Sequence, residues 1–306
     1  MSYFASATRY PYRLSVGIMC LICAIASLLL YSVIIKTFLT HPKFKNQISY
    51  FIMVNLGLFD CILSASYGCF AIFIFAESTF HAFIENIAVC LIEVSWYGIF
   101  FCSTLLAFNR FLVFSELCRP RKRFYHGCLA LIWTLFFAQL AVAQTPILKY
   151  AFWLDISLGG IDNTNGDVFA GLFDNLRFFV IISLLCVSLL LYLAIVGLLI
   201  RKRRTVTSNN AVISQSELRI LIQAFLSFVV CGVNVFLTFH VSSLFENLDS
   251  LGLMLLMLLV ELNFGFINPV MYLIVNSELR RTLCSWMGFP QKTAVHSVQT
   301  TMSTSK

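Results

Sequence analysis

The sequence predicts an all-α integral membrane protein: a seven-transmembrane helix bundle with a short amphipathic eighth helix and the N-terminus outside. The first reason is composition, since apolar residues make up 59% of the 306 residues and charged residues 11%. Soluble domains carry about 25% charged residues, and disordered chains have low hydrophobicity, so both classes are excluded. The second reason is that seven apolar stretches are long enough to cross a hydrocarbon core about 30 Å thick.

The seven stretches follow one another along the chain. Their ranges are 14–39, 48–76, 83–114, 127–148, 176–200, 218–241 and 251–275. Helices are expected here because backbone groups find no water inside lipid. Runs such as LLMLLV are apolar at every position, unlike the alternating strands of a membrane β-barrel. The longest polar stretch, 155–174, contains GGIDNTNGD and is predicted to be a loop.

The positions of the basic residues predict the orientation. Of the 21 Lys and Arg residues, 17 lie beside the first, third and fifth connections or in the C-terminal tail, and four lie on the opposite side. Cytoplasmic loops carry an excess of Lys and Arg, so the tail is expected in the cytosol. This topology signal accounts for the net charge of +7 without a nucleic-acid partner. The predicted parts are an extracellular segment (1–13), the seven-helix domain (14–275), an interfacial helix (276–287) and a disordered cytosolic tail (288–306).

Four short motifs on four of the predicted helices indicate a family. They are NLGLFD at 55–60, LLAFNRFLVF at 105–114, FVVCGVN at 228–234 and NPVMY at 268–272. Together they resemble the rhodopsin-like G-protein-coupled receptors, and the overall pattern is most similar to the nematode serpentine chemoreceptors of the Srx, Srt and Srsx types. The resemblance implies a plasma-membrane receptor, in a sensory cilium for the chemosensory types. It would bind a small-molecule cue and signal through a heterotrimeric G protein, with arrestin and a receptor kinase as further partners and no cofactor.

The resemblance also implies which residues couple to the G protein. They are Asn109, Arg110, Phe111, Tyr192, Asn268, Pro269 and Tyr272. In this reading Arg110 receives the tail of the G protein, whereas the alternative is an arginine that only reaches toward lipid headgroups. Asn109 stands where the family has an acid, and an amide lacks the charge that strengthens a hydrogen bond to arginine.

A polar core is predicted from Asp60, Asn55 and Asn234 in the second and sixth stretches. A carboxyl group in mid-membrane normally faces the bundle interior, so Asp60 is either a neutral core acid or, as the family implies, a hub bonded to Asn268. The family often binds sodium at this position. Ile99 and Phe264 stand where polar partners are expected, which argues against a sodium ion and leaves no metal site.

The ligand is expected in the outer part of the bundle, where aromatic residues gather. The candidates are Glu93, Trp96, Tyr97, Phe100, Phe236, Phe239 and Glu261. Ligand pockets are mostly apolar with a few polar anchors. The two acids are therefore either ligand anchors or protonated groups that pack between helices. The loop between the fourth and fifth stretches contains no cysteine, so the extracellular disulfide of the family is not expected.

Two further alternatives stay open from the sequence. Cys284 lies beside the apolar stripe of the interfacial helix, so it is either palmitoylated or an unmodified thiol. A transporter or channel subunit is the main rival function, although we find no internal repeat and few charges at the membrane midplane. HExxH, P-loop and GxGxxG motifs are absent from the sequence, which disfavours an enzyme.

Overall fold

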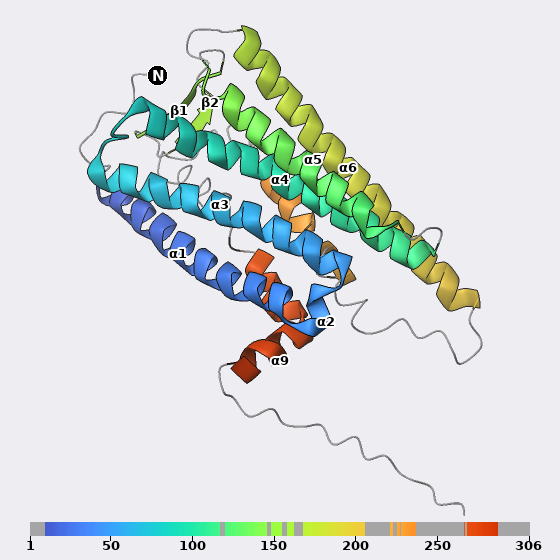
Figure 1. The fold of residues 1–306 in the computed structure, drawn as a ribbon. Coiled ribbons are helices and arrows are strands. Elements are labelled where there is room, and N and C mark those ends of the chain that lie inside the picture. The colour runs from blue at the N-terminus through green and yellow to red at the C-terminus, as the bar shows by residue number, and fades with distance from the viewer. Residues whose placement is uncertain are drawn as a thin grey trace, which may run out of the picture.

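The computed structural model describes residues 10–116, 120–145, 148–154, 158–161, 168–205, 221–222, 225–226, 228–236, 266 and 268–286. Within these residues, five helices are long and apolar enough to cross a membrane. They are α1 (Tyr10–Thr40), α3 (Ile48–Ala76), α4 (Ala82–Ser115), α5 (Lys122–Val142) and α6 (Val168–Thr205). Figure 1 shows them side by side as a bundle. The described parts of the sixth and seventh predicted stretches are helical at 228–236 and 268–275.

The helices agree with the predicted stretches in the middle of the chain and differ at several ends. α3 covers the predicted range, and α4 exceeds it by one residue at each end. α6 begins at residue 168 instead of 176, and α5 covers 122–142 instead of 127–148. The physical reason for the early starts is that hydropathy locates the lipid-facing part of a helix, whereas a helix continues through charged residues such as Lys122 or Asp174 wherever its backbone bonds are satisfied.

A β-hairpin occupies part of the stretch predicted to be a loop. Strand β1 (Tyr150–Trp153) pairs antiparallel with β2 (Leu158–Ile161), and Tyr150 lies opposite Ile161. Figure 1 shows the hairpin at the end of the bundle where α4 begins. Tyr150 and Phe152 are buried and their neighbours are less so, which is the two-residue period of a strand with one covered face. The hairpin lies close to the helices because Gly159 has no side chain, since a Cβ there would lie 2.7 Å from the Phe70 ring.

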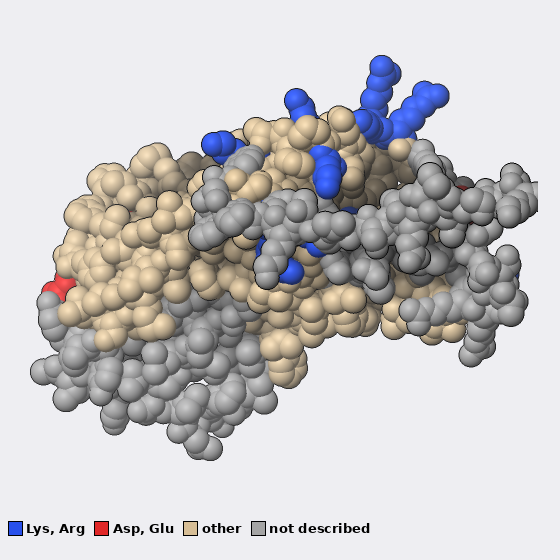
Figure 2. Space-filling model, turned by 90° about the horizontal axis from the view of Figure 1, so that it is seen from below, with Lys and Arg blue, Asp and Glu red and all other residues tan. Residues whose placement is uncertain are grey.

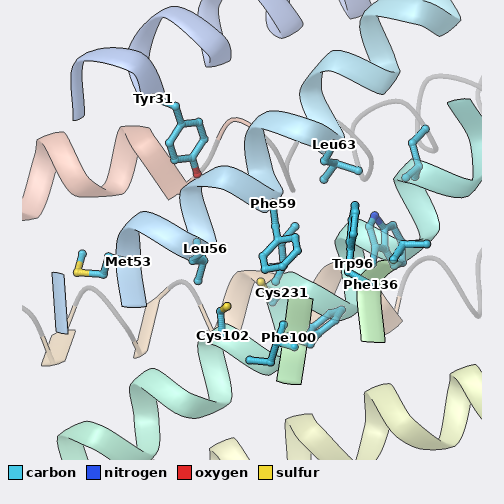
Figure 3. Close-up of a cluster of buried hydrophobic side chains, with 14 of the residues drawn as sticks. Tyr31, Met53, Leu56, Phe59, Leu63, Trp96, Phe100, Cys102, Phe136 and Cys231 are labelled. Atoms are coloured by element: carbon cyan, nitrogen blue, oxygen red, sulfur yellow. The ribbon is translucent and has the colours of Figure 1, made fainter. Parts of the chain in front are cut away.

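Aromatic packing holds α3, α4 and α5 together. Phe59 of α3 has no exposed surface, and its ring stacks on Trp133 of α5 with centroids 4.3 Å apart. Figure 3 shows Phe59 inside the buried cluster, with Trp96 and Phe136 nearby. On its other side the Phe59 ring meets the backbone of Gly98, where a Cβ would lie 2.4 Å from a ring carbon. This close approach of α4 to α3 therefore requires glycine.

We expect Gly98→Ala to lower the midpoint of thermal unfolding in detergent. The added methyl group overlaps the Phe59 ring, and overpacking of this kind costs about 1–3 kcal/mol. Gly127→Ala is the matched control, because a Cβ at this α5 position has nothing within 4 Å and alanine favours a helix by about 1 kcal/mol. Equal midpoints for the two variants would show that the α3–α4 contact is looser than described.

Charge is distributed unevenly between the two ends of the bundle. Figure 2 shows the Lys and Arg side chains over the middle and right of the visible face and an acidic group at its left edge. Lys149 beside the hairpin is exposed. The other exposed basic residues in the described part of the chain are Lys36, Lys43, Lys45, Arg121, Lys122, Arg123, Arg201, Arg280 and Arg281. They lie on the end of α1, on α2 (Pro42–Lys45), at the start of α5, at the end of α6 and on α9 (Ser277–Trp286). This basic end is called the inner end below, and the hairpin lies at the outer end.

The helix α9 lies beside α1 at the inner end (Figure 1). Asn276 precedes it, and its side-chain oxygen accepts a hydrogen bond from the Leu279 N–H at 3.1 Å, which caps the first turn. Arg280 donates to the carbonyl oxygen of Leu273 at 2.6 Å and thereby satisfies the end of the preceding helix. Asn276 thus caps the start of α9, and Arg280 of α9 caps the end of the 268–275 helix.

Candidate functional site

Asp60 is the centre of a buried hydrogen-bond group that joins three helices. Its side chain has no exposed surface. Its Oδ2 atom accepts hydrogen bonds from the Tyr31 hydroxyl of α1 and from the Asn268 amide at 3.1 Å. Its Oδ1 atom is buried and accepts no hydrogen bond from a described residue. The structure therefore brings Asp60 and Asn268 together and adds Tyr31.

Sequence reasoning missed Tyr31. A signal was present, because Tyr31 lies within the apolar run LLLYSVII and a buried tyrosine hydroxyl usually finds a hydrogen-bond partner. Its partner cannot be read from a single sequence, since it lies on another helix.

Asn55 bonds to residues other than Asp60. Asn55 accepts a hydrogen bond from the Trp133 indole at 2.9 Å and donates to the Phe51 carbonyl at 2.9 Å, so it joins α3 to α5. Asn234 is buried, with an exposed fraction of 2%. The contacts of Asn55 are therefore separate from the Asp60 group.

The inner end of α4 carries Asn109 and Arg110, both about 95% buried. The Asn109 amide donates to the Ser49 hydroxyl of α3 at 2.8 Å. Arg110 lies close enough to Tyr192 of α6 for the two groups to interact electrostatically. Phe111 is partly buried beside them. Asn109 thus ties α4 to α3, while Arg110 faces the side of α6.

Tyr192 and Tyr272 complete this inner region. The Tyr192 ring contacts Phe228 and Phe225 of the sixth stretch, with centroids 5.6 Å and 5.8 Å apart. The Tyr272 ring lies 6.2 Å from that of Phe38 on α1, one turn after the buried Pro269. Tyr192 therefore lies close to Arg110 and to the sixth stretch, and Tyr272 lies close enough to Tyr192 for the two groups to interact electrostatically.

An ion pair joins α4 to α6 nearer the outer end. The Arg177 guanidinium donates to the Glu93 carboxylate, and both side chains are largely buried. Eleven residues further along each helix, the Thr104 and Ser188 hydroxyls are hydrogen bonded at 2.9 Å. Because the two contacts are eleven residues apart on both α4 and α6, the two helices run in the same direction over about 16 Å. Sequence reasoning placed Arg177 at the outer membrane surface and missed its pairing with Glu93.

Side chains of α4 hold the hairpin over the bundle without a covalent bond. Glu85 accepts a hydrogen bond from the Phe152 N–H at 2.7 Å, and Asn86 accepts one from the Tyr150 N–H at 3.1 Å. The Phe152 ring packs on Phe70 with centroids 4.3 Å apart. Cys90 is a buried free thiol. Hydrogen bonds and aromatic contacts therefore fix this end of the molecule.

Tyr150 points from the hairpin toward the outer part of α4. Burial raises the pKa of its hydroxyl above the usual value, and Cys90 and Glu93 raise it further. The hydroxyl lies against Gln139 but makes no hydrogen bond within the described part of the chain. A buried donor therefore faces the surroundings of the Glu93–Arg177 pair.

We expect Glu85→Ala to loosen the hairpin. The variant leaves the Phe152 N–H without its charged acceptor, and such bonds are worth about 1.5–3 kcal/mol. Hydrogen exchange at Phe152 should accelerate by about tenfold or more. Glu77→Ala is the control, since Glu77 is an exposed residue at the end of α3 and its loss should leave this exchange rate unchanged. Unchanged exchange in Glu85→Ala would contradict the anchoring role.

The ligand candidates do not all face the interior. Trp96 and Phe100 of α4 are buried, with exposed fractions of 8% and 2%, and Tyr97 is partly buried. Phe236 is 54% exposed, which corrects its placement in the pocket. Asn234 and Val235 lie on the buried face of this helix. Phe236 follows Val235 and is rotated by about 100° around the helix axis, away from that face. Two further candidates, Phe239 and Glu261, lie outside the described residues.

Comparison with known proteins bears on the fold. No family model and no curated protein matches this sequence. Among solved structures, squid rhodopsin matches with a TM-score of 0.75 over 92% of this chain and 86% of that chain, at 12% sequence identity. This chain has the rhodopsin fold. The rhodopsin fold and the apolar helices identify a multi-pass membrane protein.

Proposed function

We propose that this chain is a G-protein-coupled receptor for a small-molecule cue. One observation carries the proposal. Residues of separate short motifs make contacts between helices inside one rhodopsin fold: Asn268 donates to Asp60 in the interior, and Arg110 lies buried beside Tyr192 toward the basic end. Nothing in an isolated motif requires these contacts, whereas a receptor that couples its interior to a G protein at one end does.

The buried state of Arg110 suggests how activation would proceed. With only 4% of its surface exposed, Arg110 is covered in this conformation and cannot meet a partner protein. The rings of Tyr192, Phe225 and Phe228 join α6 to the sixth stretch beside it. Outward movement of the sixth stretch would break these contacts and uncover Arg110. A ligand favours that state only if it binds it more tightly than the covered state.

Orientation and location follow from the charge distribution. The inner end carries all the exposed basic residues of the described part except Lys149, so we place it in the cytosol and the N-terminus outside. The helix α9 would then lie in the membrane interface, with Cys284 available for lipidation. We further propose a nematode-type chemosensory receptor in the plasma membrane, including that of a sensory cilium. Arrestin and a receptor kinase would bind the cytosolic side.

Nucleotide exchange and charge flux, measured on the same vesicles, separate a receptor from a transporter or channel. The full chain is reconstituted with purified heterotrimeric G proteins of each major Gα class. We expect nucleotide exchange above that of empty vesicles with at least one class, and no charge flux. Flux without exchange would overturn the proposed function and favour the rival.

A further inference from the structure

The ion pair between Glu93 and Arg177 indicates the chemical class of the ligand. Its two side chains are exposed by only 13% and 17%, and charged groups within membrane helices generally mark functional sites. The pair lies on the seam between α4 and α6, three helical turns above the Thr104–Ser188 contact of the same seam. A ligand bound there would act on both helices that carry Arg110 and Tyr192. This inference rests on the proposed function, since it concerns the ligand of the same receptor.

Charge balance restricts which ligands can insert between the two groups. Insertion breaks the direct contact, and a buried charge that loses its partner is strongly destabilising. An anion would pair with Arg177 and place a second negative charge beside Glu93, whereas a cation would pair with Glu93 and place a second positive charge beside Arg177. A molecule with one carboxylate and one ammonium satisfies both side chains and adds no net charge. Such a ligand therefore gives Glu93 and Arg177 an opposite charge each in place of the contact that insertion breaks, which offsets the cost of burying its own two charges.

Neighbouring groups suit the two ends of such a molecule. Tyr97 lies four residues after Glu93 and therefore on the same face of α4, where its ring can stabilise a bound ammonium. The buried Tyr150 hydroxyl makes no hydrogen bond with a described residue and interacts electrostatically with Glu93 and Tyr97. It is therefore available to donate to a carboxylate oxygen. Both the aromatic face and the extra donor lie beside the pair.

We propose that the receptor binds a zwitterionic small molecule of the amino-acid type, whose carboxylate pairs with Arg177 and whose ammonium pairs with Glu93. The hairpin covers the site, and Tyr150 gives the carboxylate a second donor.

Binding of three matched probe sets to the purified full-length chain tests this assignment. The sets are the twenty free amino acids, their N-acetyl derivatives, which lose the α-ammonium, and their α-methyl esters, which lose the α-carboxylate. We expect at least one free amino acid to bind. Its two derivatives should bind at least about tenfold more weakly, because each loses a charge-assisted hydrogen bond.

Variants locate the binding on the ion pair. Glu93→Gln and Arg177→Gln should each weaken binding of the free amino acid by about tenfold or more, whereas Thr104→Val, deeper on the same seam, should preserve it. If a single variant fails to fold, the exchanged double variant Glu93→Arg with Arg177→Glu keeps an ion pair. It should still prefer the free amino acid to both derivatives.

Two results would overturn the proposal: no binding by any free amino acid to the folded chain, or equal affinity for a free amino acid and one of its derivatives. Binding is measured without a G protein, so its result does not depend on whether the chain couples to a G protein. Zwitterion binding without nucleotide exchange would contradict the coupling and leave the ligand class supported.

Discussion

Arg110→Ala should abolish nucleotide exchange while the receptor still folds. In the proposed mechanism the guanidinium is the central contact for the G protein once the sixth stretch has moved. Central arginines of interfaces contribute about 2 kcal/mol or more, which corresponds to a loss of at least about 30-fold in exchange rate at limiting G protein. The measurement is nucleotide exchange in vesicles that contain equal amounts of folded receptor.

Two controls accompany this variant. Arg201→Ala removes an exposed basic side chain at the inner end of α6 and is expected to retain most of the exchange activity. Arg110→Lys keeps the charge but loses the planar, multiply donating guanidinium, so its exchange rate should lie between those of the parent and Arg110→Ala. Full activity of Arg110→Ala would remove this arginine from the coupling site.

Asp60→Ala should cause the largest loss of stability. The variant leaves the Tyr31 hydroxyl and the Asn268 amide buried without their shared acceptor. An unsatisfied buried donor costs about 1–3 kcal/mol, so we expect a loss on the order of 3 kcal/mol. The measurement is the midpoint of thermal unfolding in detergent, which should fall by several degrees.

Tyr31→Phe separates the two hydrogen bonds of the Asp60 group. It removes one donor, leaves Asn268 bonded to Asp60, and should cost about 1 kcal/mol. Ser32→Ala, which alters the neighbouring residue that bonds only within its own helix, should leave the midpoint almost unchanged. The group would be structurally unimportant if Asp60→Ala unfolded at the same temperature as Ser32→Ala.

The sequence predicted the fold where hydropathy alone decides the element. The range of α3 agrees with the prediction because apolar residues predominate along the whole length of that helix. The early start of α6 and the hairpin before it were not predicted, because hydrogen bonds and close packing decide them. The hairpin in particular depends on Glu85 and Asn86 of α4, which lie more than sixty residues away in sequence.

Contacts within the site were predictable only where a motif supplied both partners. Asp60 and Asn268 each belong to a recognisable motif, and the structure brings them together. Tyr31 and Arg177 belong to no motif, and their partners follow from how α1 and α6 pack. Burial of one face per helix can be read from a pattern, but the pairing of side chains between helices depends on the relative rotation and depth of both.

Formation of a nucleotide-sensitive complex tests the proposed coupling most directly. A receptor that promotes release of nucleotide from its G protein must, by reciprocity, bind the nucleotide-free G protein more tightly. Purified full-length chain is therefore mixed with nucleotide-free heterotrimers of each major Gα class, and the complex is measured by mass before and after addition of a non-hydrolysable GTP analogue. We predict a one-to-one complex with at least one class that dissociates when the analogue is added. Absence of a complex with every class, or a complex unaffected by the analogue, would contradict the proposed function.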